Sequence, residues 1–190
     1  MPLSPSATHR TLKHTRAITI EAFARDDGLW DLDAHITDMK TRDIQLASGI
    51  RPVGSALHDL TLRITIDTGF TIVDAEAVSD AVPYPGFCDT IGPDYKKLIG
   101  LNLLKQLRQG VKERMSGVKG CTHLTELAQI LPTAAVQAFA GEVIDTRDGA
   151  GSSGQDQQPF QLDRCHALRL DGPAVAQYYP RWAIKPSSAN

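Results

Sequence analysis

Apolar and polar residues alternate over the first half of the chain, which is the pattern of β-strands that bury one face. Four stretches show this alternation and are predicted to be strands: residues 15–24, 29–39, 58–66 and 70–78. Residues 25–28 and 67–69 join the strands of each pair, and their Asp and Gly residues suit tight turns. The polar residues 41–56 between the two pairs are predicted to be a long connection.

The second half of the chain changes to the spacing of helices. A helix is predicted over residues 94–107, with Gly100 weakening its middle, and another begins at Thr122, a good capping residue. Pro132 is expected to kink or restart this second helix, which continues over residues 133–139. Strands followed by helices predict an α+β fold, in which an antiparallel sheet of about four strands has helices packed on one face.

The length of 190 residues suits one domain, so residues 1–190 are predicted to form a single domain. Residues 141–158 are rich in glycine, serine and glutamine and are predicted to be a flexible loop. Apolar residues return over 160–182, which is expected to pack back on the domain. Residues 185–190 are expected to be a disordered tail.

Composition and charge exclude several classes of protein. The net charge of −2 offers no general attraction for nucleic acid or a membrane surface. With no apolar run of about 20 residues and no secretion signal, a cytoplasmic location is expected. The basic N-terminal residues Arg10, Lys13 and Arg16 are interpreted as a solvated arm, with a docking arm for a protein partner as the alternative. Motifs of nucleotide-binding loops, serine hydrolases and zincin proteases are absent.

The three cysteines are expected to stay reduced, as core residues, metal ligands or nucleophiles. Cys88 follows a predicted strand near a helix start, where backbone N–H groups favour the thiolate that binds metal. The alternative for Cys88 is a buried core residue. Cys121 and His123 begin the second predicted helix and offer one sulfur and one nitrogen ligand. His123 is equally explained as an ordinary histidine on the helix surface.

Other candidate residues lie on the predicted strands and in the tail. His58 begins the clearest strand and is either a metal ligand oriented by the neighbouring Asp59 or an edge residue that faces water. The alternation places Glu76 beside apolar residues, where a carboxylate serves as a base or a ligand. Cys165 and His166 are adjacent, so on a strand only one of them can enter a given site. The aspartates of the first hairpin are interpreted as a solvated face, with weak cation binding as the alternative: Asp26, Asp27, Asp31, Asp33 and Asp38.

Motifs spread over nearly the whole chain resemble those of a bacterial family known only as a domain of unknown function. They are Asp26-Asp27-Gly28-Leu29-Trp30-Asp31, His58-Asp59-Leu60, Asp74-Ala75-Glu76-Ala77, Gly120-Cys121-Thr122-His123-Leu124 and Tyr179-Pro180-Arg181-Trp182. The resemblance implies little about activity. Members of the family occur beside genes of acyl-CoA and aromatic catabolism, which implies an accessory role in such a pathway.

Residues 58–129 are similar, more distantly, to the U-type scaffold proteins on which iron–sulfur clusters are assembled. The hairpin formed by residues 62–66 and 72–76 resembles the central hairpin of that family. Cys88 matches the cysteine that follows the hairpin, and Cys121 matches a late cysteine at a helix start. The fold implied by this resemblance is again a sheet with helices on one face.

The scaffold resemblance also implies a shared site. His58 falls near an aspartate that helps to bind metal in that family, which implies that His58, Cys88 and Cys121 converge at one end of the sheet. The chain departs from the family at residues 56–57, where the family has its first cysteine. A third thiolate would therefore have to come from Cys165.

These observations predict a small metal-binding protein with a His/Cys/Cys site, holding zinc or, alternatively, iron or an iron–sulfur cluster. The expected ligands are His58, Cys88 and Cys121, with His123 or Cys165 as the fourth. Glu76 or Asp59 is expected to act as a supporting or acid–base group. One alternative is a metal-dependent lyase or hydrolase acting on a small catabolic intermediate, and another is a metal-free structural or interaction domain.

Overall fold

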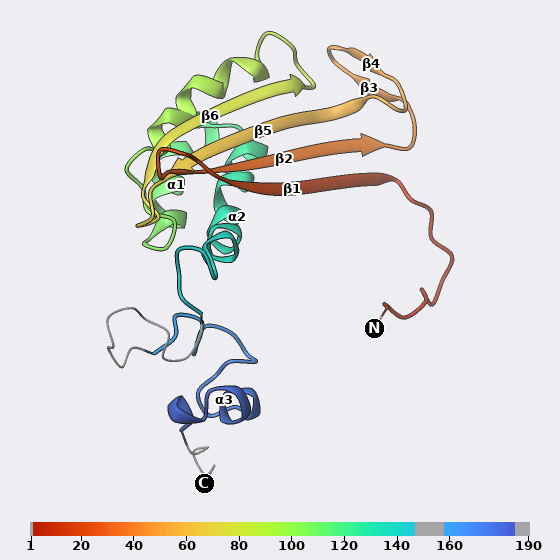
Figure 1. The fold of residues 1–190 in the computed structure, drawn as a ribbon. Coiled ribbons are helices and arrows are strands. Elements are labelled where there is room, and N and C mark those ends of the chain that lie inside the picture. Colours follow the sequence, from red (N-terminus) through yellow and green to blue (C-terminus); the bar gives the residue numbers. More distant parts are fainter. Residues whose placement is uncertain (1, 147–157, 185–190) are drawn as a thin grey trace. The chain divides into compact units, whose positions relative to one another are not determined.

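The computed structural model describes residues 2–146 and 158–184 (Figure 1). The chain divides into two compact units, Met1–Ala135 and Val136–Asn190. Residues 147–157 of the predicted loop and the predicted tail at 185–190 lie outside the described residues. The expectation that residues 1–190 form a single domain stays a prediction.

A four-stranded antiparallel sheet with the order β1-β2-β5-β6 forms the first unit together with helices (Figure 1). Its strands are β1 (His14–Ala24), β2 (Trp30–Lys40), β5 (Ala56–Ile66) and β6 (Ile72–Ala81). The four predicted strands are therefore confirmed, with ends displaced by a few residues, and so is the α+β class. β1 lies at one edge of the sheet, and all of its residues except Ile20 are exposed.

One face of the sheet forms the core. Alternate residues of β2 and β5 are at most 1% exposed on this face: Leu32, Ala34, Ile36, Leu60, Leu62 and Ile64. The opposite face carries ion pairs, such as Arg63 Nη2 with Asp33 Oδ2 at 2.6 Å. Helical residues cover the apolar face because burying it removes its side chains from water.

The covering elements of the first unit are the 3-10 helix η1 (Cys88–Leu98), α1 (Leu107–Met115), the short η2 (Gly117–Lys119) and α2 (Thr122–Phe139). Tyr95, Val111 and Leu124 are fully buried among their residues. α2 continues unbroken through Pro132, so the predicted segment after this proline belongs to the same helix. The second unit contains α3 (Pro173–Tyr178) and η3 (Pro180–Trp182). Within the described residues, no helix has both the length and the apolar character needed to cross a membrane.

The predicted helix over residues 94–107 is wrong. η1 ends at Leu98, and α1 begins only at Leu107. Between them, Gly100 has a φ of 86°, a conformation that glycine tolerates and that stops a helix. The Gly100 N–H donates to the carbonyl oxygen of Ile72 at 2.8 Å, so this segment pairs with the start of β6 instead of continuing the helix.

The predicted connection at 41–56 contains a small hairpin of its own. It is formed by β3 (Ile44–Leu46) and β4 (Gly49–Arg51). Arg51 Nη2 donates to the carbonyl oxygen of Val82 at 2.6 Å. This hydrogen bond fixes the hairpin to the chain segment just beyond β6.

A β-bulge lies between Thr65 and Ile66 of β5, where β6 contains Val73 as an extra residue. An extra residue reverses the alternation of the residues that follow it. Ala75 therefore takes the buried face, at 2% exposure, and Glu76 is exposed. The predicted position of Glu76 beside apolar residues is wrong for this reason.

Tyr95 of η1 holds the start of α2 by hydrogen bonds. Its Oη lies 2.9 Å from the Cys121 carbonyl oxygen and 2.9 Å from Thr125 Oγ1, and it accepts the Cys121 N–H at 3.1 Å. Burial raises the pKa of Tyr95 to about 12, so the phenol keeps its proton at neutral pH. Three groups at the start of α2 therefore depend on this single hydroxyl.

We expect Tyr95→Phe to lower the free energy of unfolding by about 1–3 kcal/mol, because it leaves buried polar groups without a partner. Urea unfolding measures the change. Tyr178→Phe is the matched control, since Tyr178 is 67% exposed and its substitution should have little effect. Equal losses in both variants would show that the Tyr95 hydroxyl contributes nothing particular.

Candidate metal centre

A row of polar residues crosses three strands at one end of the buried face. Asp38 follows Leu32, Ala34 and Ile36 on the same side of β2, and it is only 2% exposed. The strand register places Arg16 of β1 on one side of Asp38 and His58 of β5 on the other. The apolar face of the sheet therefore ends in a buried carboxylate with a cation and an imidazole as its cross-strand neighbours.

The Asp38 carboxylate accepts four hydrogen bonds. Oδ1 accepts from His14 Nε2 at 2.7 Å and from Arg16 Nε at 2.9 Å. Oδ2 accepts from Arg16 Nη2 and from His58 Nδ1, each at 2.9 Å. Burial alone would raise the pKa of Asp38, but the bonds from Arg16 and His14 outweigh it and hold the pKa well below its usual range. Asp38 is therefore ionised at neutral pH.

α2 brings a further histidine to this carboxylate from its first turn. His123 Nε2 lies 3.8 Å from Asp38 Oδ2, and the His123 ring lies over the His58 ring with 3.8 Å between their centroids. Gly120 lets the chain before α2 pass close to the end of α1, because a Cβ there would lie 2.5 Å from the carbonyl oxygen of Met115. Asp38, His58 and His123 thus meet within the first unit.

Arg16 connects the cluster to the next turn of α2. Its Nη1 donates to Glu126 Oε2 at 2.7 Å, while its other guanidinium nitrogens hold Asp38. The Glu126 side chain is 42% exposed, against 3% for Asp38, so the Asp38 contact is the better shielded of the two. One cation therefore joins β1, β2 and α2.

Asp38, His58 and His123 form a group that can hold a metal ion. One ligand atom from each lies within 4.8 Å of the others, and the described part of the chain contains no other such group. Burial and the neighbouring His123 lower the pKa of His58, and burial and Arg16 lower the pKa of His123. Both imidazoles are therefore neutral at pH 7, which is the form that binds metal.

A cavity of about 420 Å³ adjoins the two imidazoles. His58, His123, Cys88 and Cys121 line it together with mainly apolar residues. Cys121 Sγ lies 3.8 Å from His123 Nδ1. Four residues proposed from the sequence as ligands are thus gathered around one cavity, although the group with converging ligand atoms contains Asp38 and no cysteine.

A family model matches residues 14–137, which is well over half of the chain. The chain belongs to the DUF2889 family of proteins of unknown function. This confirms the predicted membership of a family of unknown function, while the similarity to iron–sulfur scaffold proteins stays a prediction. No curated protein and no solved structure matches the chain. The DUF2889 region contains Asp38, His58 and His123 as well as Cys88 and Cys121.

Three of the residues proposed from the sequence are not members of the cluster. Cys165 is exposed, follows the DUF2889 region and belongs to the second unit. Glu76 is exposed, with its Oε2 4.0 Å from Arg63 Nη1. The Asp59 carboxylate is hydrogen-bonded to His35 Nε2 at 2.6 Å. The carboxylate that orients His58 is therefore Asp38 and not the neighbouring Asp59.

The sequence interpretation names Asp38 only among five aspartates of the first hairpin, as a solvated face or a weak cation site, and does not single it out. Asp38 nevertheless shares the alternation of Leu32, Ala34 and Ile36 and is buried. A carboxylate at a position of the apolar face is a buried charge, and a buried charge requires partners. The position of this aspartate two residues after Ile36, in step with the buried residues of the strand, is the signal in the sequence that identifies Asp38.

We expect Asp38→Asn to lower the free energy of unfolding by about 1.5–3 kcal/mol, because it weakens the charge-assisted hydrogen bonds from Arg16 and the two histidines. Urea unfolding near neutral pH measures the loss. Asp33→Asn is the matched control, since the Asp33–Arg63 pair lies on the exposed face and should contribute less than about 1 kcal/mol. A loss at Asp38 no larger than at Asp33 would contradict the central role of Asp38.

The histidines predict how stability depends on pH in protein freed of metal by a chelator. Their folded pKa values lie below the unfolded value of about 6.5, so the unfolded chain binds more protons between these pKa values. The free energy of unfolding should therefore be highest above about pH 7 and fall as the pH drops to about 5.5. Urea unfolding at these two pH values checks this, and His123→Gln should show a smaller fall. Stability that rises on acidification would disprove it.

Proposed function

We propose that this chain binds one divalent transition-metal ion, zinc or alternatively ferrous iron, through Asp38, His58 and His123. The observation that carries the proposal is the approach of three potential ligand atoms within 4.8 Å of one another. Two neutral imidazoles and one carboxylate form a ligand set found in catalytic zinc sites and in non-haem iron sites. An iron–sulfur cluster is not part of the proposal, because clusters are held by thiolates and this group has none.

The hydrogen bonds around Asp38 are compatible with such an ion. In such a site Oδ1 would keep its hydrogen bonds from His14 and Arg16, and the ion would replace the hydrogen bond from His58 Nδ1 to Oδ2. The bond from Arg16 Nη2 to Oδ2 remains, which keeps the carboxylate oriented. To accept a metal at Nδ1, the His58 ring would therefore have to move its one proton from Nδ1 to Nε2, with no net loss of a proton.

A ligand set of three residues leaves coordination positions open for water or substrate. His58 and His123 line the cavity, so we place these open positions toward it. An ion at such a position supplies Lewis acidity or a bound hydroxide. We therefore propose a metal-dependent lyase or hydrolase acting on a small catabolic intermediate. The three free cysteines fit a cytoplasmic location, where thiols stay reduced.

Zinc titration of chelator-treated protein, followed by elemental analysis, tests the proposal. We expect about one zinc per chain for the native protein and more than about tenfold weaker binding for His123→Ala and Asp38→Asn. His35→Ala is the matched control, because His35 is also bonded to an aspartate, Asp59, but is not one of the three ligands. It should bind zinc as the native protein does.

Two other outcomes are informative. Loss of metal in a Cys88→Ala, Cys121→Ala double variant, with retention in His123→Ala, would replace the proposed centre by the His/Cys/Cys site expected from the sequence. Absence of metal binding in the folded native protein would reject both sites. The hydrogen bonds of Asp38 would then serve a structural or interaction domain.

A further inference from the structure

The cavity beside the cluster has the dimensions and the lining of a small-molecule site. Its volume of about 420 Å³ lies within the range of about 300–1,000 Å³ that is usual for ligand pockets. His58, His123 and Cys121 form its polar part, whereas Leu60, Val82 and Ile91 are among its apolar residues. This division favours a ligand with an apolar body and one polar end.

The charges of the lining restrict the ligand further. Among the residues that the structure describes, those that line the cavity include no lysine, arginine, aspartate or glutamate. Arg16, the cation of the neighbouring cluster, is already bonded to both Asp38 and Glu126. In the metal-free cavity, an anionic ligand would lose its hydration without gaining a counter-charge, and this transfer is strongly unfavourable.

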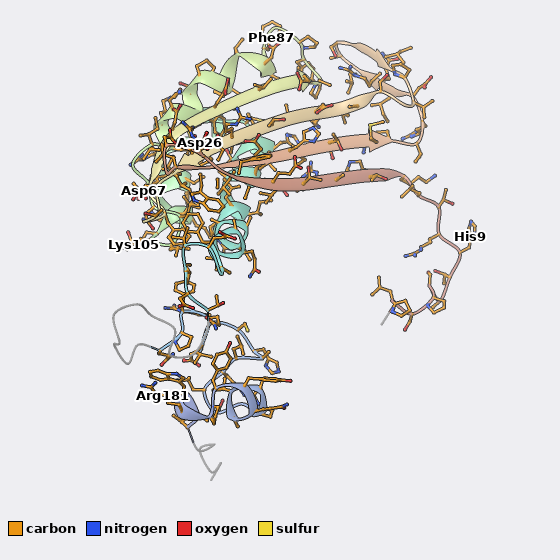
Figure 2. All side chains as sticks on the ribbon, viewed as in Figure 1. His9, Asp26, Asp67, Phe87, Lys105 and Arg181 are labelled. Atoms are coloured by element: carbon orange, nitrogen blue, oxygen red, sulfur yellow. The ribbon has the colours of Figure 1, made fainter. Side chains whose placement is uncertain are left out.

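An exposed aromatic side chain contributes to the cavity lining. Phe87 lines the cavity and is nevertheless 80% exposed, on the turn between β6 and η1 (Figure 2). The turn is ordered by hydrogen bonds from the N–H groups of Phe87 and Cys88 to the carbonyl oxygen of Tyr84, at 3.2 and 3.0 Å. Gly86 within it has a φ of 80°, which glycine adopts readily. A defined turn therefore holds an apolar surface toward a ligand.

We propose that this cavity binds an uncharged, largely apolar small molecule, with its polar end at His58 and His123 and its apolar body against Leu60, Ile91 and Phe87. The inference concerns the metal-free cavity and goes beyond the proposed metal binding. Binding of the apolar body does not itself require the metal, so the two ideas can be tested separately.

Two fluorescent probes that differ by one charged group test the proposal. N-phenyl-1-naphthylamine is uncharged, and 8-anilinonaphthalene-1-sulfonate is the same molecule with a sulfonate. In chelator-treated, folded protein we expect saturable binding of the amine with about one site per chain, and at least about tenfold weaker binding of the sulfonate. Proton NMR of the histidine rings localises the amine, because its binding should shift the signals of His58 and His123.

Phe87→Ser should weaken binding of the uncharged probe about tenfold, because the probe would lose the apolar ring that it covers. Val118→Ser is the matched control: Val118 is also fully exposed but is not part of the cavity lining. It should bind the probe as the native protein does. Equal or stronger binding of the sulfonate would overturn the proposal, and so would an unchanged affinity in Phe87→Ser.

The probe experiment and the zinc titration test the two proposals separately. Probe binding without zinc binding would support the apolar ligand and reject the proposed metal activity. Zinc binding without probe binding would support the metal centre and reject the proposed class of ligand. Each result is read in the full chain, with circular dichroism confirming that every variant is folded.

Discussion

A single buried carboxylate, Asp38, organises the end of the sheet where the candidate site lies. Its charge would be very unfavourable inside the protein without partners, and all of its hydrogen-bonding capacity is used. The donors come from β1 and β5, and Arg16 extends the network to α2. Placing this one charge therefore determines the orientation of His58 and links the strands to the helix that carries His123.

Much of the fold could be predicted because the alternation of residues within one strand shows which of its faces is buried. The period of two in residues such as Leu32, Ala34 and Ile36 is visible without knowing what covers them. The predictions that failed depend on partners distant in sequence. Val73 forms a bulge only when β6 is paired with β5, and Gly100 ends the helical region through a bond to Ile72.

In the candidate site, too, the features with a local signal could be predicted and those that depend on distant partners could not. His58 and His123 could be proposed because each stands at the start of an element, where a side chain is free to reach a site. Their common partner could not be recognised by spacing, because the β3–β4 hairpin, two strands of the sheet and three helical elements separate Asp38 from His123 in sequence. Glu76 and Asp59 were proposed from local position alone, and the sheet turns both toward other partners. Its position on the buried face of β2, more than its residue type, distinguishes Asp38 from the partly exposed Asp31 and Asp33.

The exposed edge strand gives this arrangement an unusual weak point. β1 has only one neighbouring strand, and nearly all of its residues face water. Yet it supplies both His14 and Arg16 to the most deeply buried charge of the sheet. Fraying of β1 would therefore expose Asp38 to water and break the Arg16–Glu126 ion pair at the same time. Local opening of this edge strand would thus also take the candidate centre apart. The least protected strand of the sheet thus controls access of water to its most protected carboxylate.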